Sequence, residues 1–320
     1  MIIIATINIF LCFFLSKVIN PYNQYFRVYA TISIFGFAGV YVISSIINPN
    51  IMLIVAMIFL SLYILGRREY MDLFLNDVVL SAKGTKDIDA LYIADTQFDI
   101  PGSIFDEAFD NVIAMVNDNP ADLLLLGGDF LNQKENIDLV VNKFKAIDQS
   151  KFKYGVYAVM GNHDYVNYEN LVIEFESIGI KCLENDYINI EELDLTLVGV
   201  VDSWKNEPEY TILNRVEDRL GTTVVLAHQP DEVDHMEGDF DVMLSGHYHA
   251  GQMNFVFGIQ LNALVAKYIY GLYHVGENRL FVTSGVGGSI GRFKYAPYLR
   301  YLARPEVALI KLRGKDETSR

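Results

Sequence analysis

Acidic residues are absent from the first 66 residues of the chain, which contain only two basic residues, Lys17 and Arg27. The remaining 254 residues contain 23 Lys and Arg against 40 Asp and Glu, so the formal net charge of −15 divides into +2 and −17. So acidic a C-terminal part argues against nucleic acid as a partner, because phosphate backbones are bound by surfaces of Lys and Arg. The change of composition near Gly66 predicts a boundary between an apolar region and a water-soluble one.

Cysteine is scarce too, with Cys12 in the apolar region and Cys182 in the acidic one. This distribution argues against a disulfide framework and fits a reducing compartment. The sequence also lacks internal repeats, low-complexity tracts and long linkers.

Three apolar runs are present before the boundary, and we interpret them as three transmembrane helices within residues 1–66. Residues 28–47 carry no charge and would span about 30 Å as a helix, the thickness of a bilayer core. Residues 1–16 and 51–66 are shorter, and buried or interfacial helices are the alternative for these two. The basic residues beside these runs are Lys17, Arg27, Arg67 and Arg68. They predict an inner-membrane protein with Met1 outside and the acidic part in the cytoplasm.

Residues 88–313 alternate short apolar runs with amphipathic stretches, as in an α/β domain. We expect residues 67–87 to be a connector and residues 314–320 a polar tail. Five apolar runs are followed directly by polar residues: 91–94, 123–126, 156–160, 224–227 and 241–244. Helical patterns after Ser103 and over residues 136–148 separate the first three runs and predict a β-α-β-α-β order. Sites in such sheets form at the carboxyl ends of the strands, so these polar residues should cluster.

The polar residues after these runs are oxygen and nitrogen donors. They are Asp95-Thr96-Gln97, Gly127-Gly128-Asp129, Gly161-Asn162-His163-Asp164, His228 and Gly246-His247-Tyr248-His249. A set without thiolates suits Mn²⁺, Fe or Zn²⁺. A carboxylate such as Asp129 can bridge two cations about 3.5–4 Å apart, an arrangement that serves displacement at phosphate. The glycines before Asp129, Asn162 and His247 are expected to adopt backbone angles that side chains disfavour.

In this order, the five motifs resemble those of the calcineurin-like metallophosphoesterases, over residues 88–312. Within that superfamily, residues 244–252 (LSGHYHAGQ) are similar to the LSGHTHGGQ of membrane-anchored bacterial YkuE/YaeI-type phosphoesterases. Further matching positions are residues 270–273, residues 284–287, Arg292 and Pro305-Glu306. The resemblance implies a four-layer α/β/β/α sandwich that follows the transmembrane helices.

The resemblance also implies two divalent metal ions, Mn, Fe or Zn, bridged by Asp129. The first ion would be held by Asp95, Asp129 and His249, and the second by Asp129, Asn162, His228 and His247. His163 is implied to stabilise the transition state or to protonate the leaving group, with Asp164 orienting its ring.

Gln97 departs from the pattern, because most members of the superfamily have a histidine at this position. A glutamine oxygen can bind a hard cation but is a poorer donor than imidazole toward borderline metals. Gln97 is therefore a candidate ligand of a first metal that is expected to be weakly held.

Three functional hypotheses follow from these residues and the resemblance. The first is hydrolysis of a phosphodiester, pyrophosphate or phosphomonoester at the membrane surface. The second is a specific version of the first, with a lipid-linked substrate such as UDP-2,3-diacylglucosamine. The third is a non-catalytic membrane binding module with a weakened metal site.

Four residues outside the motifs are given ordinary roles. His235 and His274 are expected at the surface or in packing, and Arg292 either guides an anionic substrate or pairs with a carboxylate. For Trp204, packing beneath a loop is favoured over lining the pocket.

Overall fold

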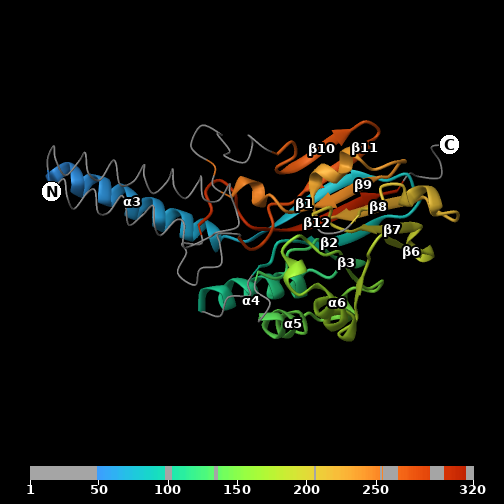
Figure 1. Cartoon of the computed structure of the whole chain (residues 1–320), viewed down its shortest axis with the longest axis horizontal. Coiled ribbons are helices and arrows are strands. Elements are labelled where there is room, and N and C mark those ends of the chain that lie inside the picture. The colour runs from blue at the N-terminus through green and yellow to red at the C-terminus, as the bar shows by residue number, and fades with distance from the viewer. Residues whose placement is uncertain are drawn as a thin grey trace. The chain divides into compact units, whose positions relative to one another are not determined.

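The computed structural model describes residues 49–97, 103–132, 136–204, 207–252, 254, 266–288 and 299–314 (Figure 1). The chain divides into two compact units, Met1–Leu65 and Gly66–Arg320. Helix α3 (Pro49–Tyr70) includes the third predicted span, whereas the other two, residues 1–16 and 28–47, lie outside the described residues. Across the described ranges, no helix combines the length and apolarity that crossing a bilayer requires. The third predicted span is therefore not supported as a transmembrane helix, and the first two stay predictions.

Two six-stranded mixed sheets form the centre of the second unit. The first has the order β1-β12-β2-β3-β4-β5, with β1 (Phe74–Ser81), β2 (Ile88–Ile93), β3 (Leu123–Leu126), β4 (Val156–Ala158), β5 (Ile180–Cys182) and β12 (Glu306–Arg313). The second has the order β10-β11-β9-β8-β7-β6, with β6 (Asp186–Ile190), β7 (Leu195–Val200), β8 (Thr222–Ala227), β9 (Val242–Ser245), β10 (Gly271–Val275) and β11 (Asn278–Val282).

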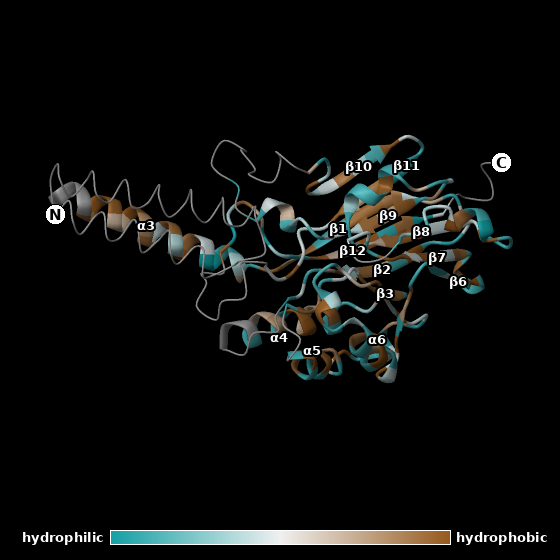
Figure 2. Ribbon diagram, in the orientation of Figure 1, coloured by the Kyte–Doolittle hydropathy of each residue, from teal (hydrophilic) through white to brown (hydrophobic). Residues whose placement is uncertain are grey.

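The predicted β-α-β-α-β order is confirmed in the first sheet. Strands β2, β3 and β4 are parallel neighbours, connected through α4 (Ser103–Asp118) and α5 (Ile137–Phe144). All four residues of β3 are buried, because both faces of this sheet are covered and a parallel strand between two layers is apolar throughout. The apolar character of the inner strands is visible in β9 of the second sheet (Figure 2).

Three apolar clusters hold the layers together. Helices α4, α5 and α6 (Tyr168–Ser177) lie together on one side of the sheets (Figure 1) and pack on the first sheet through residues such as Phe109, Phe144 and Phe175. The second cluster lies between the sheets. Along β2 the side chains alternate between these two clusters, Leu91 toward the helices and Tyr92 toward the second sheet.

The outer face of the second sheet carries the third cluster. It is covered by the 3-10 turns η5 (Ile212–Arg215) and η6 (Pro230–Asp234), which contribute Ile212 and Val233. The expected fourth layer of α-helices is thus replaced by short turns in the described part of this face. The mixed α/β sandwich is confirmed, with this difference in its outer layer.

The prediction that residues 67–87 are only a connector is wrong for Phe74–Ser81. These residues form β1, which pairs in parallel with β12 at the edge of the first sheet. Only Leu80 of the strand is buried, because an edge strand has one neighbour and packs on few residues. The resulting weak apolar pattern explains why the strand was missed.

Candidate metal centre

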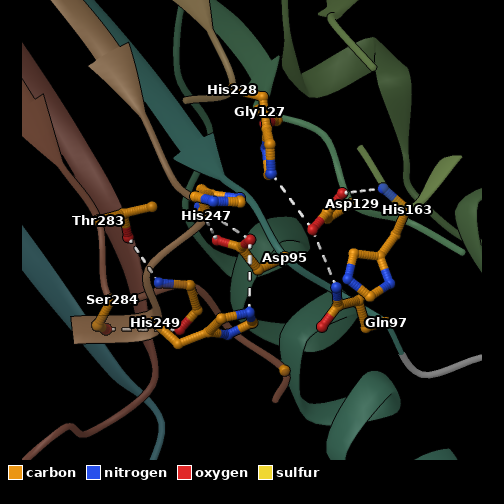
Figure 3. A network of polar contacts seen from close by, with 12 residues as sticks. Asp95, Gln97, Gly127, Asp129, His163, His228, His247, His249, Thr283 and Ser284 are labelled. Atoms are coloured by element: carbon orange, nitrogen blue, oxygen red, sulfur yellow. Dashed lines mark hydrogen bonds and ion pairs between the residues drawn. The ribbon is translucent and has the colours of Figure 1, made fainter. Parts of the chain in front are cut away.

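The candidate ligands follow five strands whose carboxyl ends meet. Loops after β2, β3 and β4 in the first sheet carry Asp95, Asp129 and Asn162, and loops after β8 and β9 in the second carry the histidines. Figure 3 shows Asp95, Gln97, Asp129, His163, His228, His247 and His249 around one space. The two sheets therefore contribute complementary halves of one site.

Asp129 lies at the centre of this arrangement and is almost completely buried. Its Oδ2 is 3.2 Å from His228 Nε2 and accepts a 3.0 Å hydrogen bond from Gln97 Nε2. Its Oδ1 accepts a 2.8 Å hydrogen bond from the backbone N–H of His163. Ligand atoms of Asp129, His228 and His247 all lie within 4.8 Å of one another, a spacing that can hold a metal ion.

Asp95 and His249 form a second group within the site. Asp95 Oδ1 is 3.7 Å from His249 Nε2, and its two carboxylate oxygens are 3.0 and 3.2 Å from the backbone N–H of His247. His228 is oriented separately, because its Nδ1 lies 2.7 Å from the Gly127 carbonyl oxygen and leaves Nε2 directed at Asp129. Such hydrogen bonds from the second ring nitrogen commonly fix metal-binding histidines.

The unpartnered polar atoms of the site fit a cation. Among the described residues, the buried atoms without a hydrogen-bond partner include Gln97 Oε1, Asn162 Oδ1, His247 Nδ1 and His249 Nδ1. Buried polar atoms normally have partners, so a cluster of unsatisfied acceptors in one place indicates a missing ligand. Oxygen and nitrogen donors without thiolate match the divalent ions expected from the sequence.

Backbone strain is concentrated in the same residues. Of the ten non-glycine residues with positive φ in the described ranges, five are candidate ligands: Asp95 (57°), Gln97 (42°), Asp129 (58°), His247 (72°) and His249 (49°). Positive φ is uncommon for residues with a side chain and clusters at functional sites. Gln97 shares this feature with the ligands, although its amide nitrogen faces Asp129 in this structure.

The glycines before the ligands serve two different purposes. Gly128 has a φ of +93°, as the sequence predicted. Gly161 is instead required for space, because a Cβ there would lie 2.3 Å from Asp129 Oδ1. The same is true of Gly246, whose Cβ would lie 2.5 Å from Asp95 Oδ2. Close approach of neighbouring loops, rather than an unusual backbone angle, therefore explains the glycines at positions 161 and 246.

Asp164 joins two of the loops that carry candidate ligands. Its buried carboxylate accepts four backbone hydrogen bonds, from Asp129 and Gly161 at 2.8 Å, Phe130 at 2.7 Å and Leu131 at 2.9 Å. These donors belong to the loops after β3 and β4, so the carboxylate joins the two loops. Asp164 thus orients the backbone that carries Asp129, and its role in orienting the His163 ring stays a prediction.

Burial and charge set the ionisation of the site without metal. Burial, opposed by His228 and reinforced by Asp129, raises the pKa of Asp95 to about 7. Burial also acts to raise the pKa of Asp129, but His228 and His163 outweigh it and hold that pKa below its ordinary value. Burial would lower the pKa of His228, but the charge of Asp129 raises it well above the usual range.

The other two histidines are shifted toward the neutral form. Burial, with His228, lowers the pKa of His247 to about 3, and burial, with Arg300, lowers the pKa of His249 well below its ordinary value. Neutral imidazole is the form that binds metal. Without metal, His228 thus favours the protonated form, whereas His247 and His249 favour the neutral form that can bind metal.

A family model for calcineurin-like phosphoesterases matches residues 88–251. The chain belongs to this family. Its members are metal-dependent hydrolases that use divalent ions, so the family assignment and the donor set agree.

Individual relatives support the assignment. A metallophosphoesterase of Helicobacter pylori (strain J99) is 30% identical over 226 residues, which cover 68% of this chain and 58% of the relative. The phosphodiesterase YaeI of Escherichia coli is 31% identical over 238 residues, covering 69% of this chain and 81% of YaeI. YkuE of Bacillus subtilis is 26% identical over 219 residues, 66% of this chain and 74% of YkuE. The predicted likeness to the YkuE/YaeI type is confirmed, and the chain spans less than two thirds of the Helicobacter relative.

Residues outside the motifs are placed as follows. His235 and His274 are exposed, as predicted, and Arg292 lies outside the described residues. Trp204 is 63% exposed, so the prediction that it packs beneath a loop is wrong.

The sequence reasoning missed two buried charged residues near the site. Asp202 accepts two 2.9 Å hydrogen bonds from Gln229, the residue after His228. Arg300 is fully buried beside the loop that packs on Asp95. Neither lies in a motif, and only the three-dimensional structure relates them to the ligands.

Proposed function

We propose that this protein hydrolyses a phosphoester at a dinuclear metal centre. The observation that carries the proposal is the convergence of candidate ligand residues from both sheets. Five of them have positive φ, and several have buried polar atoms without a hydrogen-bond partner among the described residues. The ligand set is Asp95, Gln97, Asp129, Asn162, His228, His247 and His249.

The first ion is assigned to Asp95, Asp129 and His249, with Gln97 as a neutral fourth candidate, and the second to Asp129, Asn162, His228 and His247. Mn, Fe and Zn all suit these donors. When bound, such ions polarise phosphoryl oxygens and stabilise the charge that develops on them.

His163 has no place in either ligand set and is proposed to act on the substrate. Its backbone N–H is bonded to Asp129, which holds it beside the centre, and its side chain is only half buried. An imidazole there can donate a hydrogen bond to a phosphoryl oxygen or protonate the leaving oxygen.

The function is tested with purified metal-free protein reloaded with Mn²⁺, Fe²⁺ or Zn²⁺ and assayed on a chromogenic phosphodiester, a phosphomonoester and a pyrophosphate. Asp129→Asn keeps the shape of the side chain but removes the shared charge, so metal content and activity should both be lost. Asp77→Asn is a matched control, because Asp77 is an exposed carboxylate on β1 paired with Lys311 at 2.6 Å.

Full activity in Asp129→Asn would refute the proposal. A wild-type protein that binds two ions but hydrolyses none of the three substrate classes would favour the non-catalytic binding module. The observation behind that second candidate is the Gln97 amide nitrogen, which faces Asp129 where an imidazole ligand is more common.

The substrate is proposed to be a phosphoester at the cytoplasmic face of the inner membrane, with lipid-linked pyrophosphates such as UDP-2,3-diacylglucosamine as the specific version. Support comes from the composition of residues 1–66, which lack acidic residues, and from apolar side chains of α3 such as Leu53 and Ile64, which are more than half exposed. Reporter fusions at residue 320 test the location. Alkaline phosphatase activity from such a fusion, without a cytoplasmic reporter signal, would contradict it.

A further inference from the structure

Arg300 is a fully buried cation that binds backbone rather than a carboxylate. Its guanidinium donates to the carbonyl oxygens of Ser284 at 2.8 Å, Gly285 at 3.2 Å, Gly287 at 3.0 Å and Ala303 at 2.9 Å. Within the described ranges, no ion pair joins Arg300 to an acidic side chain. Burying a charge is costly unless all of its hydrogen bonds are made. The buried guanidinium at this position therefore indicates that the conformation of the loop it binds is important.

That loop, residues 284–287, packs directly on Asp95. The backbone N–H of Val286 donates to Ala94 at 3.1 Å, and that of Gly287 donates to the Asp95 carbonyl at 2.9 Å. A Cβ on Gly285, which has a φ of +66°, would lie 2.7 Å from Asp95 Oδ2. The loop therefore fixes both the backbone and the carboxylate of Asp95, and Arg300 fixes the loop.

The segment that carries Arg300, residues 299–303, also holds the chain that follows His249. Tyr301 donates a 3.0 Å backbone hydrogen bond to Gln252 and accepts one of 2.9 Å from Asn254. The Asn254 side chain donates to the carbonyl oxygens of Ala250 and Leu302 at 2.8 and 2.9 Å. Segment 299–303 thus contacts the supports of both Asp95 and His249.

These contacts all support the residues assigned to the first metal ion. Asp95 and His249 are the two residues assigned to the first ion alone, and both have positive φ. The first ion also lacks the imidazole that most relatives supply at the position of Gln97. A site with a weaker ligand set depends more on the rigidity of the ligands that remain.

We propose that Arg300 is a positioning residue for the first metal ion: by tying loop 284–287 to segment 299–303, it holds Asp95 and His249 in the geometry that binds metal. The inference rests on the proposed function, since it presupposes the dinuclear centre.

The test is a Mn²⁺ titration of the full chain, followed by EPR, which separates a single ion from an exchange-coupled pair. Wild-type protein should bind two ions and show the coupled signal. Arg300→Met should weaken the second equivalent about 10–100-fold, the usual effect of losing an outer support of a metal ligand. A mononuclear signal should then replace the coupled one. Arg300→Lys should be intermediate, because an ammonium presents three donors from one point instead of a planar fork.

Arg279→Met is the matched control. Arg279 is mostly buried and donates to the carbonyl oxygen of Asp241 at 2.8 Å and to that of Ser81, and its polar partners among the described residues lie outside the loops that carry the ligands. It should lower thermal stability as Arg300→Met does, while both Mn²⁺ equivalents bind within about twofold of wild type.

Two ions bound by Arg300→Met with wild-type affinity would overturn the inference and leave the proposed function standing. A wild-type protein that binds no Mn²⁺ would refute the proposed function and the inference with it. If Arg300→Met does not fold, Arg300→Lys decides alone: a weakening of about threefold or more supports the inference, and unchanged affinity overturns it.

Discussion

Asp164→Asn separates the role that the structure gives this residue from the one that the sequence predicted. The carboxylate accepts four backbone N–H groups, two on each oxygen. Asparagine has the same shape but only one acceptor oxygen, so two buried N–H groups would lose their acceptor and face an NH₂ group instead. A hydrogen bond to a charged group contributes about 1.5–3 kcal/mol. Burial and the charge of Asp129 raise the pKa of Asp164 to about 8, so above that pH the substitution should cost about 3–6 kcal/mol.

The assay is thermal unfolding of the metal-free protein, so that metal binding does not contribute to the difference. At about 2–4 °C per kcal/mol for a domain of this size, the midpoint should fall by roughly 6–24 °C. Asp148→Asn is the control, because this exposed carboxylate also accepts a backbone hydrogen bond, from Ser150 at 3.2 Å, and should change the midpoint far less. An unchanged midpoint in Asp164→Asn with lost turnover would refute the reasoning and restore the expected role of orienting His163.

Three further predictions concern the centre itself. The stability that Asp95 contributes to the metal-free protein, measured as the difference between wild type and Asp95→Asn, should be smaller at about pH 8 than at about pH 5, because the pKa of Asp95 is about 7 when folded against 3.8 for the free group. The bound proton that favours the folded state is lost as the pH rises between these values. Unfolding midpoints of wild type and Asp95→Asn test this, and equal pH slopes would contradict it. Gln97→His should bind the first ion more tightly in a metal titration at one pH, since imidazole is the stronger donor for borderline metals; unchanged affinity would show that residue 97 points away from that ion. His163→Ala should slow turnover while metal analysis finds the content nearly intact, and stoichiometric metal loss would contradict its place outside the ligand set.

The strands that position the site could be predicted from the sequence because they are parallel and buried. Such strands are continuous apolar runs, as in residues 123–126, and the polar residue after each run marks the carboxyl end of a strand. Parallel neighbours end at the same edge of a sheet, so the order of motifs along the chain was enough to bring Asp95, Asp129 and Asn162 together. The histidines after β8 and β9 reached the same place because the two sheets pack face to face.

The parts that could not be predicted depend on distances between segments remote in sequence. Three of the four N–H groups that Asp164 binds lie 33 to 35 residues away, and no local pattern around Gly161-Asn162-His163-Asp164 reports them. The hydrogen bonds that the Arg300 side chain donates to described residues all go to backbone carbonyls. Every residue type offers the same carbonyl, so these partners cannot be recognised in the sequence. Strand β1 was missed for a related reason, since an edge strand buries few side chains and lacks a clear apolar pattern.

The strained backbone of the ligand loops needs stabilising contacts, and Asp164 and Arg300 supply some of them. A residue with a side chain is disfavoured in the left-handed region by about 1–2 kcal/mol, and five candidate ligands have positive φ. The summed cost, on the order of 5–10 kcal/mol, is comparable to the net stability of a typical domain. It must be offset by contacts that exist only when the loops are in place. Asp164 supplies four such hydrogen bonds to the loops after β3 and β4, and Arg300 binds the loop that packs on Asp95. We therefore expect a protein that carries all seven candidate ligands without these two residues to bind metal more weakly.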